Sequence, residues 1–174
     1  MLQDYTTYQV LQAFFDYPRM PFHVRKLSRM LHLGPISVIN HLKRLLKEKL
    51  ITINKEGIYP TYQANRENEK FKLLKKQNII LRLHQSNLPT YLEETLRPSC
   101  IALFGSAARG EDTEQSDIDL FIQAPGVSLD LSKYEKMLHR KINILFEHDL
   151  KSLSNELLNN IINGNILSGY LKVL

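Results

Sequence analysis

A glycine-serine pair followed by two aspartates is the combination in this chain best suited to chemistry. Ten residues separate Ser106 from Asp117 in the stretch LFGSAARGEDTEQSDIDLFI, residues 103–122. A glycine and a serine where a strand meets a helix let phosphate oxygens approach free backbone N–H groups. Two carboxylates one residue apart on a strand face the same side and offer hard oxygen ligands to a divalent cation. The stretch therefore predicts a site for a polyphosphate with Mg²⁺ or Mn²⁺.

Two apolar strands are expected to position these residues. SCIALF ends at Gly105 and is short, apolar and bounded, as in a buried strand, and SAARG begins a helical turn. In SDIDLFI the residues alternate, which places Asp117, Asp119 and Phe121 on one face of the second strand. The opposite face, which we expect to face the core, carries Ile118, Leu120 and Ile122.

This stretch resembles the minimal nucleotidyltransferases of the polymerase β superfamily, which share Gly-Ser, ten residues and Asp-x-Asp. The likeness runs from about Cys100 to the end, including IINGNILSGYLKV. It implies transfer of a nucleoside monophosphate from a nucleoside triphosphate, with Gly105 and Ser106 holding the triphosphate. Asp117 and Asp119 would be the catalytic residues and would bind the metal ions. Arg109 has two interpretations: a phosphate contact, or a structural pair with Asp112 or a nearby acid.

One position departs from the pattern of this superfamily. A third carboxylate is expected on the strand KINILF, where this chain has Asn143. A neutral amide cannot act as a base, so we expect weaker metal binding and weak or absent turnover. Glu147 is no simple replacement, because four rises of a strand separate it from Asn143 by about 13 Å. The chain is therefore either a nucleotidyltransferase or a nucleotide sensor that has lost catalysis.

The rest of this half completes a small mixed sheet with helices. PGVSLDLSKYEKMLHRK predicts a turn and a helix between the two later strands. Asp149 is expected to cap a final helix, whose apolar positions are Leu150, Leu153, Leu157 and Leu158.

The charge of the chain is divided unevenly along its length. Residues 1–65 contain nine Lys and Arg against four Asp and Glu, whereas residues 99–174 contain seven against ten. This asymmetry predicts two domains with different partners, the basic one a candidate for the phosphate backbone of DNA.

The N-terminal segment shows the pattern of three helices and a hairpin. Helical spacing joins Val10, Leu11, Phe14 and Phe15, then Val24, Leu27, Met30 and Leu31, then Val38, Leu42, Leu45 and Leu46. HLG makes the turn between the second and third helices, and Pro35 suits a first helical turn. LITIN, KEG and IYPTYQAN predict a strand, a turn and a returning strand, the last weakened by Pro60.

This segment resembles the winged helix-turn-helix domains of small microbial transcription regulators. The resemblance implies binding of double-stranded DNA as a homodimer, with the third helix in the major groove and the wing beside it. The residues expected at the DNA are Ser37, Asn40, His41, Lys43, Arg44, Lys47 and Lys55. The alternative is that Lys43, Arg44 and Lys47 form only the solvated face of an amphipathic helix.

Together these patterns predict an α+β chain: residues 1–65 as a winged helix, 66–97 as a helical linker and 98–174 as the nucleotidyltransferase-like domain. In the linker, Phe71, Leu74, Ile79, Leu81 and Leu83 could pack on a partner chain or on the neighbouring domain. Cys100 is the sole cysteine, which excludes an intrachain disulfide and indicates a buried small side chain.

No apolar stretch reaches the roughly twenty residues of a membrane helix, and the N-terminus lacks a signal-peptide pattern. We therefore expect a cytoplasmic protein that has no membrane partner. Two functions remain: nucleotidyl transfer to an unknown hydroxyl acceptor, for which a protein is one candidate, or a DNA-binding regulator that senses a nucleotide.

Overall fold

The computed structural model describes residues 6–172. Residues 1–5 and 173–174, which the predicted domains at each end include, lie outside the described residues. The chain divides into two compact units, Met1–Lys75 and Lys76–Leu174, and each is described by itself. The division falls inside α4 (Glu69–Gln85), within the segment that was expected to link the domains.

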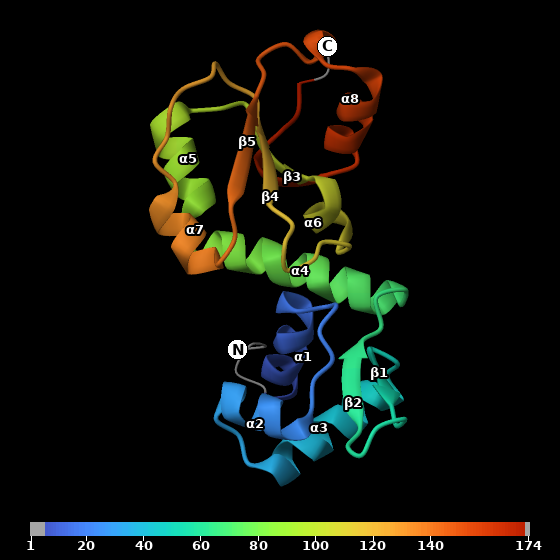
Figure 1. Ribbon diagram of the computed structural model, residues 1–174. Helices are drawn as coiled ribbons and strands as arrows, with labels where there is room; N and C mark the ends of the chain where they lie inside the picture. Colours follow the sequence, from blue (N-terminus) through green and yellow to red (C-terminus); the bar gives the residue numbers. More distant parts are fainter. Residues whose placement is uncertain (1–5, 173–174) are drawn as a thin grey trace. The chain divides into compact units, whose positions relative to one another are not determined.

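The first unit contains three helices followed by a β-hairpin, in the predicted order (Figure 1). The elements are α1 (Thr6–Asp16), α2 (Val24–Leu31), α3 (Pro35–Lys47), β1 (Ile51–Asn54) and β2 (Thr61–Ala64). The two strands are antiparallel, with Ile51 opposite Ala64. An isolated bridge between Phe22 and Tyr62 joins the segment before α2 to the hairpin. The order of elements agrees with a winged helix, and that identification stays a prediction.

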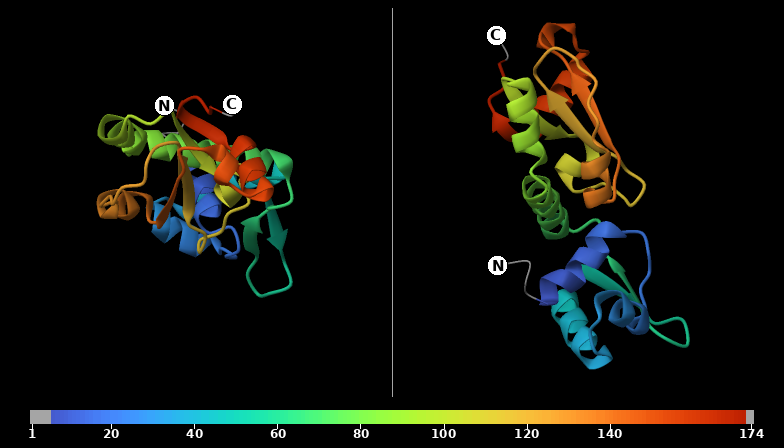
Figure 2. Two further views of the ribbon diagram at one scale, coloured as in Figure 1. Left: turned by 90° about the horizontal axis from the view of Figure 1, so that it is seen from above. Right: turned by 90° about the vertical axis from the view of Figure 1, so that its left-hand side faces the viewer.

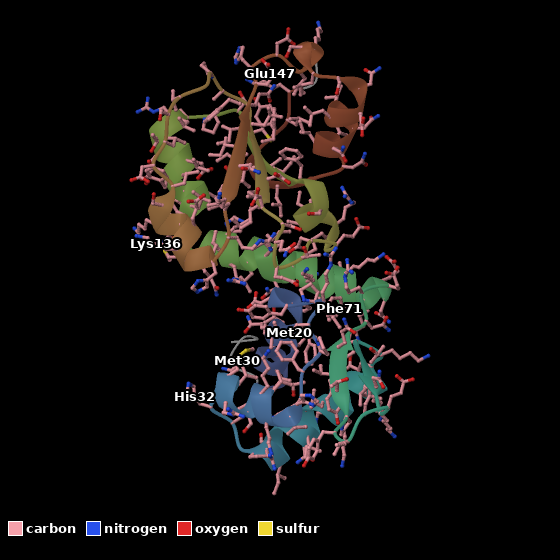
Figure 3. The ribbon with its side chains drawn as sticks, viewed as in Figure 1. Met20, Met30, His32, Phe71, Lys136 and Glu147 are labelled. Atoms are coloured by element: carbon pink, nitrogen blue, oxygen red, sulfur yellow. The ribbon has the colours of Figure 1, made fainter. Side chains whose placement is uncertain are left out.

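The core of the first unit is aromatic and aliphatic. The predicted stripe of α1 is confirmed, because Val10, Leu11, Phe14 and Phe15 are all buried. The ring centroids of Phe15 and Phe71 lie 5.2 Å apart, so the first turn of α4 belongs to this core (Figure 3). In α3 the side chains of Val38, Leu42 and Leu45 are buried and that of Leu46 is half-buried.

Two details of the first unit differ from the sequence prediction. Met30 was expected on the buried face of α2, but its side chain is 39% exposed and only Leu27 of this helix is fully buried. An eight-residue helix presents few turns to the core, so its outer apolar positions stay in contact with solvent. The returning strand was expected to include Pro60, but β2 begins at Thr61. Proline has no N–H for the ladder, so Ile58 and Tyr59 lie in the hairpin loop.

The second unit is built on a four-stranded mixed sheet in the order β5-β4-β3-β6 (Figures 1 and 2). The strands are β3 (Cys100–Phe104), β4 (Ile118–Ile122), β5 (Ile142–Phe146) and β6 (Asn165–Gly169). β3 is antiparallel to both β4 and β6, and β4 is parallel to β5. The two strands that were expected to hold the glycine-serine pair and the aspartates are therefore direct neighbours.

β6 was missed in the sequence, where the chain was expected to end in a helix. NILSG is short and mixed in polarity, and its half-exposed position at the sheet edge leaves little apolar pattern to detect. The turn before it requires Gly164, because a Cβ there would lie 2.5 Å from the carbonyl oxygen of Leu103.

Each face of the sheet is covered by its own apolar cluster. One face packs Ile101, Leu103, Ile118, Leu120 and Ile122 against α4, α5 (Leu88–Leu96) and α7 (Ser132–Leu138). This confirms the predicted core face of β4. The other face packs Cys100, Ala102 and Phe121 against Leu150 and Ile161, the latter from α8 (Asn155–Ile162). Cys100 is fully buried, as expected, and burial raises the pKa of its thiol.

The structure also differs from the sequence prediction in the linker and near the end of the chain. On α4, Ile79 and Leu83 are buried within the second unit, whereas Leu81 is 40% exposed and does not belong to the expected stripe. Asp149 caps only the 3₁₀ turn Leu150–Ser152, accepting a hydrogen bond from the Lys151 N–H. α8 starts later and is capped by Ser154, whose side chain accepts from the Leu157 N–H. Among residues 6–172, no helix is long and apolar enough to cross a membrane.

Candidate active site

The sheet register brings three predicted positions to one place. In the ladder of β4 with β3, Asp119 lies opposite Phe104, the residue directly before Gly105. In the parallel ladder of β4 with β5, Asp119 lies opposite Asn143. Asp117 directly precedes β4 rather than lying within it. Because side chains alternate along a strand, the glycine turn, both aspartates and Asn143 gather on the same side of the sheet.

Asn143 forms hydrogen bonds with the carboxylates of both aspartates. Its Nδ2 donates to Asp117 Oδ2 over 3.0 Å and to Asp119 Oδ1 over 3.3 Å. Two carboxylate oxygens from separate residues thus lie within hydrogen-bond reach of one atom. Hydrogen bonds to ionised acceptors are stronger than neutral ones, so the amide holds the negative charges together and partly offsets their repulsion.

Gly105 is the residue that lets the turn approach the aspartates. Its φ of +71° lies in the left-handed region that favours glycine, and a Cβ at this position would lie 2.6 Å from Asp119 Oδ2. Any side chain here would therefore displace the carboxylate. Ser106 follows within the five-residue helix α6 (Gly105–Arg109) and is half-buried. The structure thus places the glycine-serine pair beside the aspartates.

The acid partner of Arg109 is Glu111. Arg109 Nε lies 2.8 Å from Glu111 Oε2, and both side chains are about half exposed, so the pair contributes little to stability. The structural-pair interpretation of Arg109 is supported with a nearby acid. The specific pairing of Arg109 with Asp112 was wrong, because Asp112 pairs with an arginine from further along the chain.

That arginine is Arg140, which the sequence reasoning missed. Arg140 Nη1 lies 2.7 Å from Asp112 Oδ2, with side chains only 13% and 3% exposed, and Nη2 donates to the carbonyl oxygen of Asp117 over 3.1 Å. A buried ion pair therefore fixes the backbone of the first aspartate. No local pattern indicates it, since 28 positions separate the two partners.

Glu147, which is labelled in Figure 3, does not serve as the third acid, because its carboxylate is engaged in its own loop. Its Oε1 accepts hydrogen bonds from the backbone N–H groups of His148 and Asp149. A side-chain hydrogen bond from Ser152 and these backbone bonds lower the pKa of its carboxyl group. Glu147 thus organises its own loop.

The donor set fits one hard divalent cation. Two carboxylate oxygens already converge on the position of the Asn143 amide, and rotation of that amide would present a third oxygen, Oδ1. Within residues 6–172, no cluster of three or more His, Cys, Asp or Glu side chains suits a metal ion. The site therefore has one acidic ligand fewer than a three-carboxylate site.

The residues expected at DNA lie mostly on the surface of the first unit. Asn40, Lys43, Arg44 and Lys47 are exposed on α3, Ser37 is half-buried, and Lys55 is exposed in the hairpin loop. His41 differs, because its Nδ1 lies 2.8 Å from Thr7 Oγ1 of α1 and the ring is half-buried. Burial and the nearby Arg44 lower the pKa of this imidazole. The structure thus turns His41 toward its own core.

Comparison with known proteins gives a match to a family model and a match to a curated protein. The family model described as polymerase beta, nucleotidyltransferase matches residues 86–169, a span that includes α5 through β6 and every residue of the candidate active site. A protein of Methanocaldococcus jannaschii named "Putative protein adenylyltransferase MJ1379" is 39% identical over 82 residues, which cover 42% of this chain and 78% of the relative.

Proposed function

The chain belongs to the polymerase β nucleotidyltransferase family, and from this membership we propose that it transfers a nucleoside monophosphate from a nucleoside triphosphate to a hydroxyl group. The observation that carries the proposal is the convergence of Asp117 and Asp119 beside the Gly105 turn. In the reaction, the acceptor oxygen forms a bond to the α-phosphorus while the bond from that phosphorus to pyrophosphate breaks. The hydroxyl proton leaves with a base or with water.

Each residue of the site has a part in this reaction. Gly105 and Ser106 form the turn against which the triphosphate lies, and the missing Cβ at Gly105 lets this turn lie directly beside the Asp119 carboxylate. Asp117 and Asp119 would hold the divalent cation, Mg²⁺ or Mn²⁺, through their carboxylate oxygens. The bound cation would neutralise charge on the phosphate oxygens. Arg140 keeps the backbone of Asp117 in place through its contact with the carbonyl oxygen.

Asn143 limits the rate of this reaction. Its amide cannot accept the acceptor's proton, and general base catalysis contributes a factor of about 10²–10⁴ where it operates. We therefore propose a slow enzyme, whose acceptor loses its proton to one of the two aspartates or to water. If turnover is absent and nucleotide binding remains, the second unit is a nucleotide sensor for the first.

The acceptor that we propose is a hydroxyl group on a protein. The support is the name of the Methanocaldococcus jannaschii relative, "Putative protein adenylyltransferase MJ1379".

The test is incubation of the protein with Mg²⁺ and each α-³²P-labelled nucleoside triphosphate. We expect label transfer or pyrophosphate release with the wild type and neither with the double variant Asp117→Ala, Asp119→Ala. A matched control is Asp130→Ala, which removes an exposed acid of the same unit that lies outside the site. Equal release by wild type and double variant would contradict the proposal.

We also propose that the first unit binds double-stranded DNA, as a homodimer, through the exposed face of α3 and the hairpin loop. The observation that favours this is that Lys43, Arg44 and Lys47 are exposed on α3 while its opposite face, with Val38, Leu42 and Leu45, is buried. A helix whose polar face is free and basic is suited to a phosphate-lined groove.

Fluorescence anisotropy with duplex DNA over a salt series tests this second proposal. Binding should weaken steeply as salt rises, and Lys43→Ala should weaken it uniformly and reduce the salt slope by about one. The matched control is Lys133→Ala, an exposed lysine of the second unit. A DNA affinity that does not depend on salt concentration would contradict this proposal. Light scattering of the protein in solution tests whether it is a dimer.

A further inference from the structure

A cavity of the first unit lies between the start of α2, the start of α3 and the loop of the hairpin. Its volume is about 570 Å³, which is within the range of about 300–1,000 Å³ that small-molecule sites occupy. Figure 2 shows the hairpin loop projecting from the first unit. The apolar surface of the cavity comes from Val24, Pro35, Tyr59 and Pro60. None of these residues belongs to the candidate active site.

Hydrogen bonds fix the walls of this cavity. Phe22 and Tyr62 exchange two backbone hydrogen bonds of 2.8 Å, which join the segment before α2 to the hairpin. His23 Nδ1 lies 3.2 Å from the carbonyl oxygen of Pro60, to which the ring nitrogen can donate. The hairpin loop is therefore held against the start of α2, and the cavity is a feature of the packed unit.

The cavity is suited to an anion. Its lining includes three cations, all exposed and all from α2, namely Arg25, Lys26 and Arg29. The sequence around them has no opposite charge, because the chain carries no Asp or Glu between Asp16 and Glu48. Cations gathered on the wall of a cavity raise the local potential and attract anions. Three of them favour a ligand with more than one negative charge.

Tyr59 gives the same cavity a planar surface. Its side chain is 64% exposed in the hairpin loop, and the guanidinium carbon of Arg25 lies 5.8 Å from the centroid of its ring. This cation–π contact orients the ring. An aromatic side chain in a basic groove stacks on a nucleobase whichever base it is, because every base has a π-face. A ligand that matches both the cations and the ring combines a planar heteroaromatic ring with a phosphate group.

We propose that this cavity binds a nucleoside phosphate, at a site of its own that does not use the aspartates of the second unit. The base stacks on Tyr59, and the phosphates contact Lys26 and Arg29. The bound nucleotide occupies the start of α3 and the hairpin loop, so it competes with DNA for this surface. Only the competition rests on the proposed DNA binding, and occupation of the cavity requires neither proposed function.

Calorimetric titration with ADP in EDTA tests the assignment, on the whole chain carrying Asp117→Ala and Asp119→Ala. Removal of the divalent cation and of both aspartates disables the nucleotide site proposed for the second unit, so the remaining binding reports the cavity. Stacking tolerates any base, and ADP therefore serves as the probe. Adenosine and inorganic pyrophosphate should each bind at least about tenfold more weakly than ADP, because each lacks one half of the ligand.

Variants made in the same background separate the two halves of the ligand. Arg29→Ala should weaken ADP binding by about tenfold and leave adenosine binding unchanged. Tyr59→Ala should weaken the binding of ADP and of adenosine by about tenfold and leave pyrophosphate binding unchanged. Tyr59→Phe keeps the ring and should bind ADP as its parent does. The matched control is Arg19→Ala, an exposed arginine of the same unit that does not line the cavity.

Two results would overturn the assignment: no binding of ADP in EDTA, or ADP binding that neither Arg29→Ala nor Tyr59→Ala changes. Both leave nucleotidyl transfer intact, since that reaction is measured on the wild type with Mg²⁺. In the anisotropy assay with duplex DNA, ADP should weaken DNA binding, and DNA binding that ADP does not change would overturn the competition. Arg29 and Tyr59 are exposed, and circular dichroism checks that the variants fold.

Discussion

Replacing Asn143 by aspartate tests whether the hydrogen bonds of this amide offset the repulsion between Asp117 and Asp119 in the absence of a metal. In the wild type the Asn143 amide donates to Asp117 Oδ2 and Asp119 Oδ1 over 3.0 and 3.3 Å. Asn143→Asp removes both hydrogen bonds and adds a third negative charge at the same place. Because the position is exposed, solvent screens the charges and each lost bond costs about 1 kcal/mol.

The repulsion adds to this loss. Two unit charges 4 Å apart repel by about 1 kcal/mol in water and by about 4 kcal/mol at an effective dielectric constant of about 20. With two neighbouring carboxylates near the aqueous limit, Asn143→Asp should lower the free energy of unfolding by about 3–4 kcal/mol without divalent cations. Asn143→Ala, which loses the bonds and adds no charge, should lower it by about 1–2 kcal/mol.

A divalent cation should reverse the order of the two variants. Asn143→Asp supplies a third acidic ligand, so Mn²⁺ should bind it more tightly than it binds the wild type, and a concentration one hundred times the dissociation constant stabilises by about 2.7 kcal/mol. The assay is thermal unfolding followed by circular dichroism, in EDTA and in MnCl₂. We expect Mn²⁺ to raise the midpoint of Asn143→Asp by several degrees more than that of Asn143→Ala. Two results would refute this reasoning. In EDTA, Asn143→Asp would have the same unfolding midpoint as the wild type, or Mn²⁺ would raise the midpoints of both variants equally.

Three further predictions follow from the same structure. Gly105→Ala should abolish nucleotidyl transfer and lower the free energy of unfolding by about 1–2 kcal/mol, because the left-handed backbone is strained and the Asp119 carboxylate is displaced. The control is Gly126→Ala, whose Cβ would meet its nearest atom at 3.6 Å and which should change neither the transfer nor the stability. Arg140→Met removes the cation beside the buried Asp112 carboxylate and should lower the free energy of unfolding in urea by about 3–5 kcal/mol; if Arg140→Met with Asp112→Leu is as unstable as the single variant, the ion pair is not the cause. The lowered pKa of His41 means that the unfolded chain takes up a proton first as the pH falls below the ordinary value of 6.5, so stability is greatest above that value and declines until the folded ring is also protonated. Between pH 7.5 and 5, the urea midpoint of the wild type should fall more steeply with decreasing pH than that of His41→Asn. Parallel curves would show that the titration of His41 does not cause the loss of stability.

Local chemistry in the sequence was sufficient to predict the candidate site's main residues and most elements. The alternation in SDIDLFI predicted which side of β4 faces the core, and the stripe of α1 predicted its buried face, because each depends only on the period of a strand or a helix. The absence of an acid at position 143 was also visible, since the expected strand KINILF could be identified from its apolar residues.

Tertiary structure decided what depends on partners distant in the chain. The Arg140–Asp112 pair, the contact of His41 with Thr7 and the addition of β6 to the sheet edge join residues that no local period relates. The same holds for the hydrogen bonds of Asn143, because a spacing in sequence gives the residue type at a position and only the strand register gives what that residue touches. Residue types along the chain fix which chemical groups the site contains, whereas packing of the four strands places an amide between the two carboxylates.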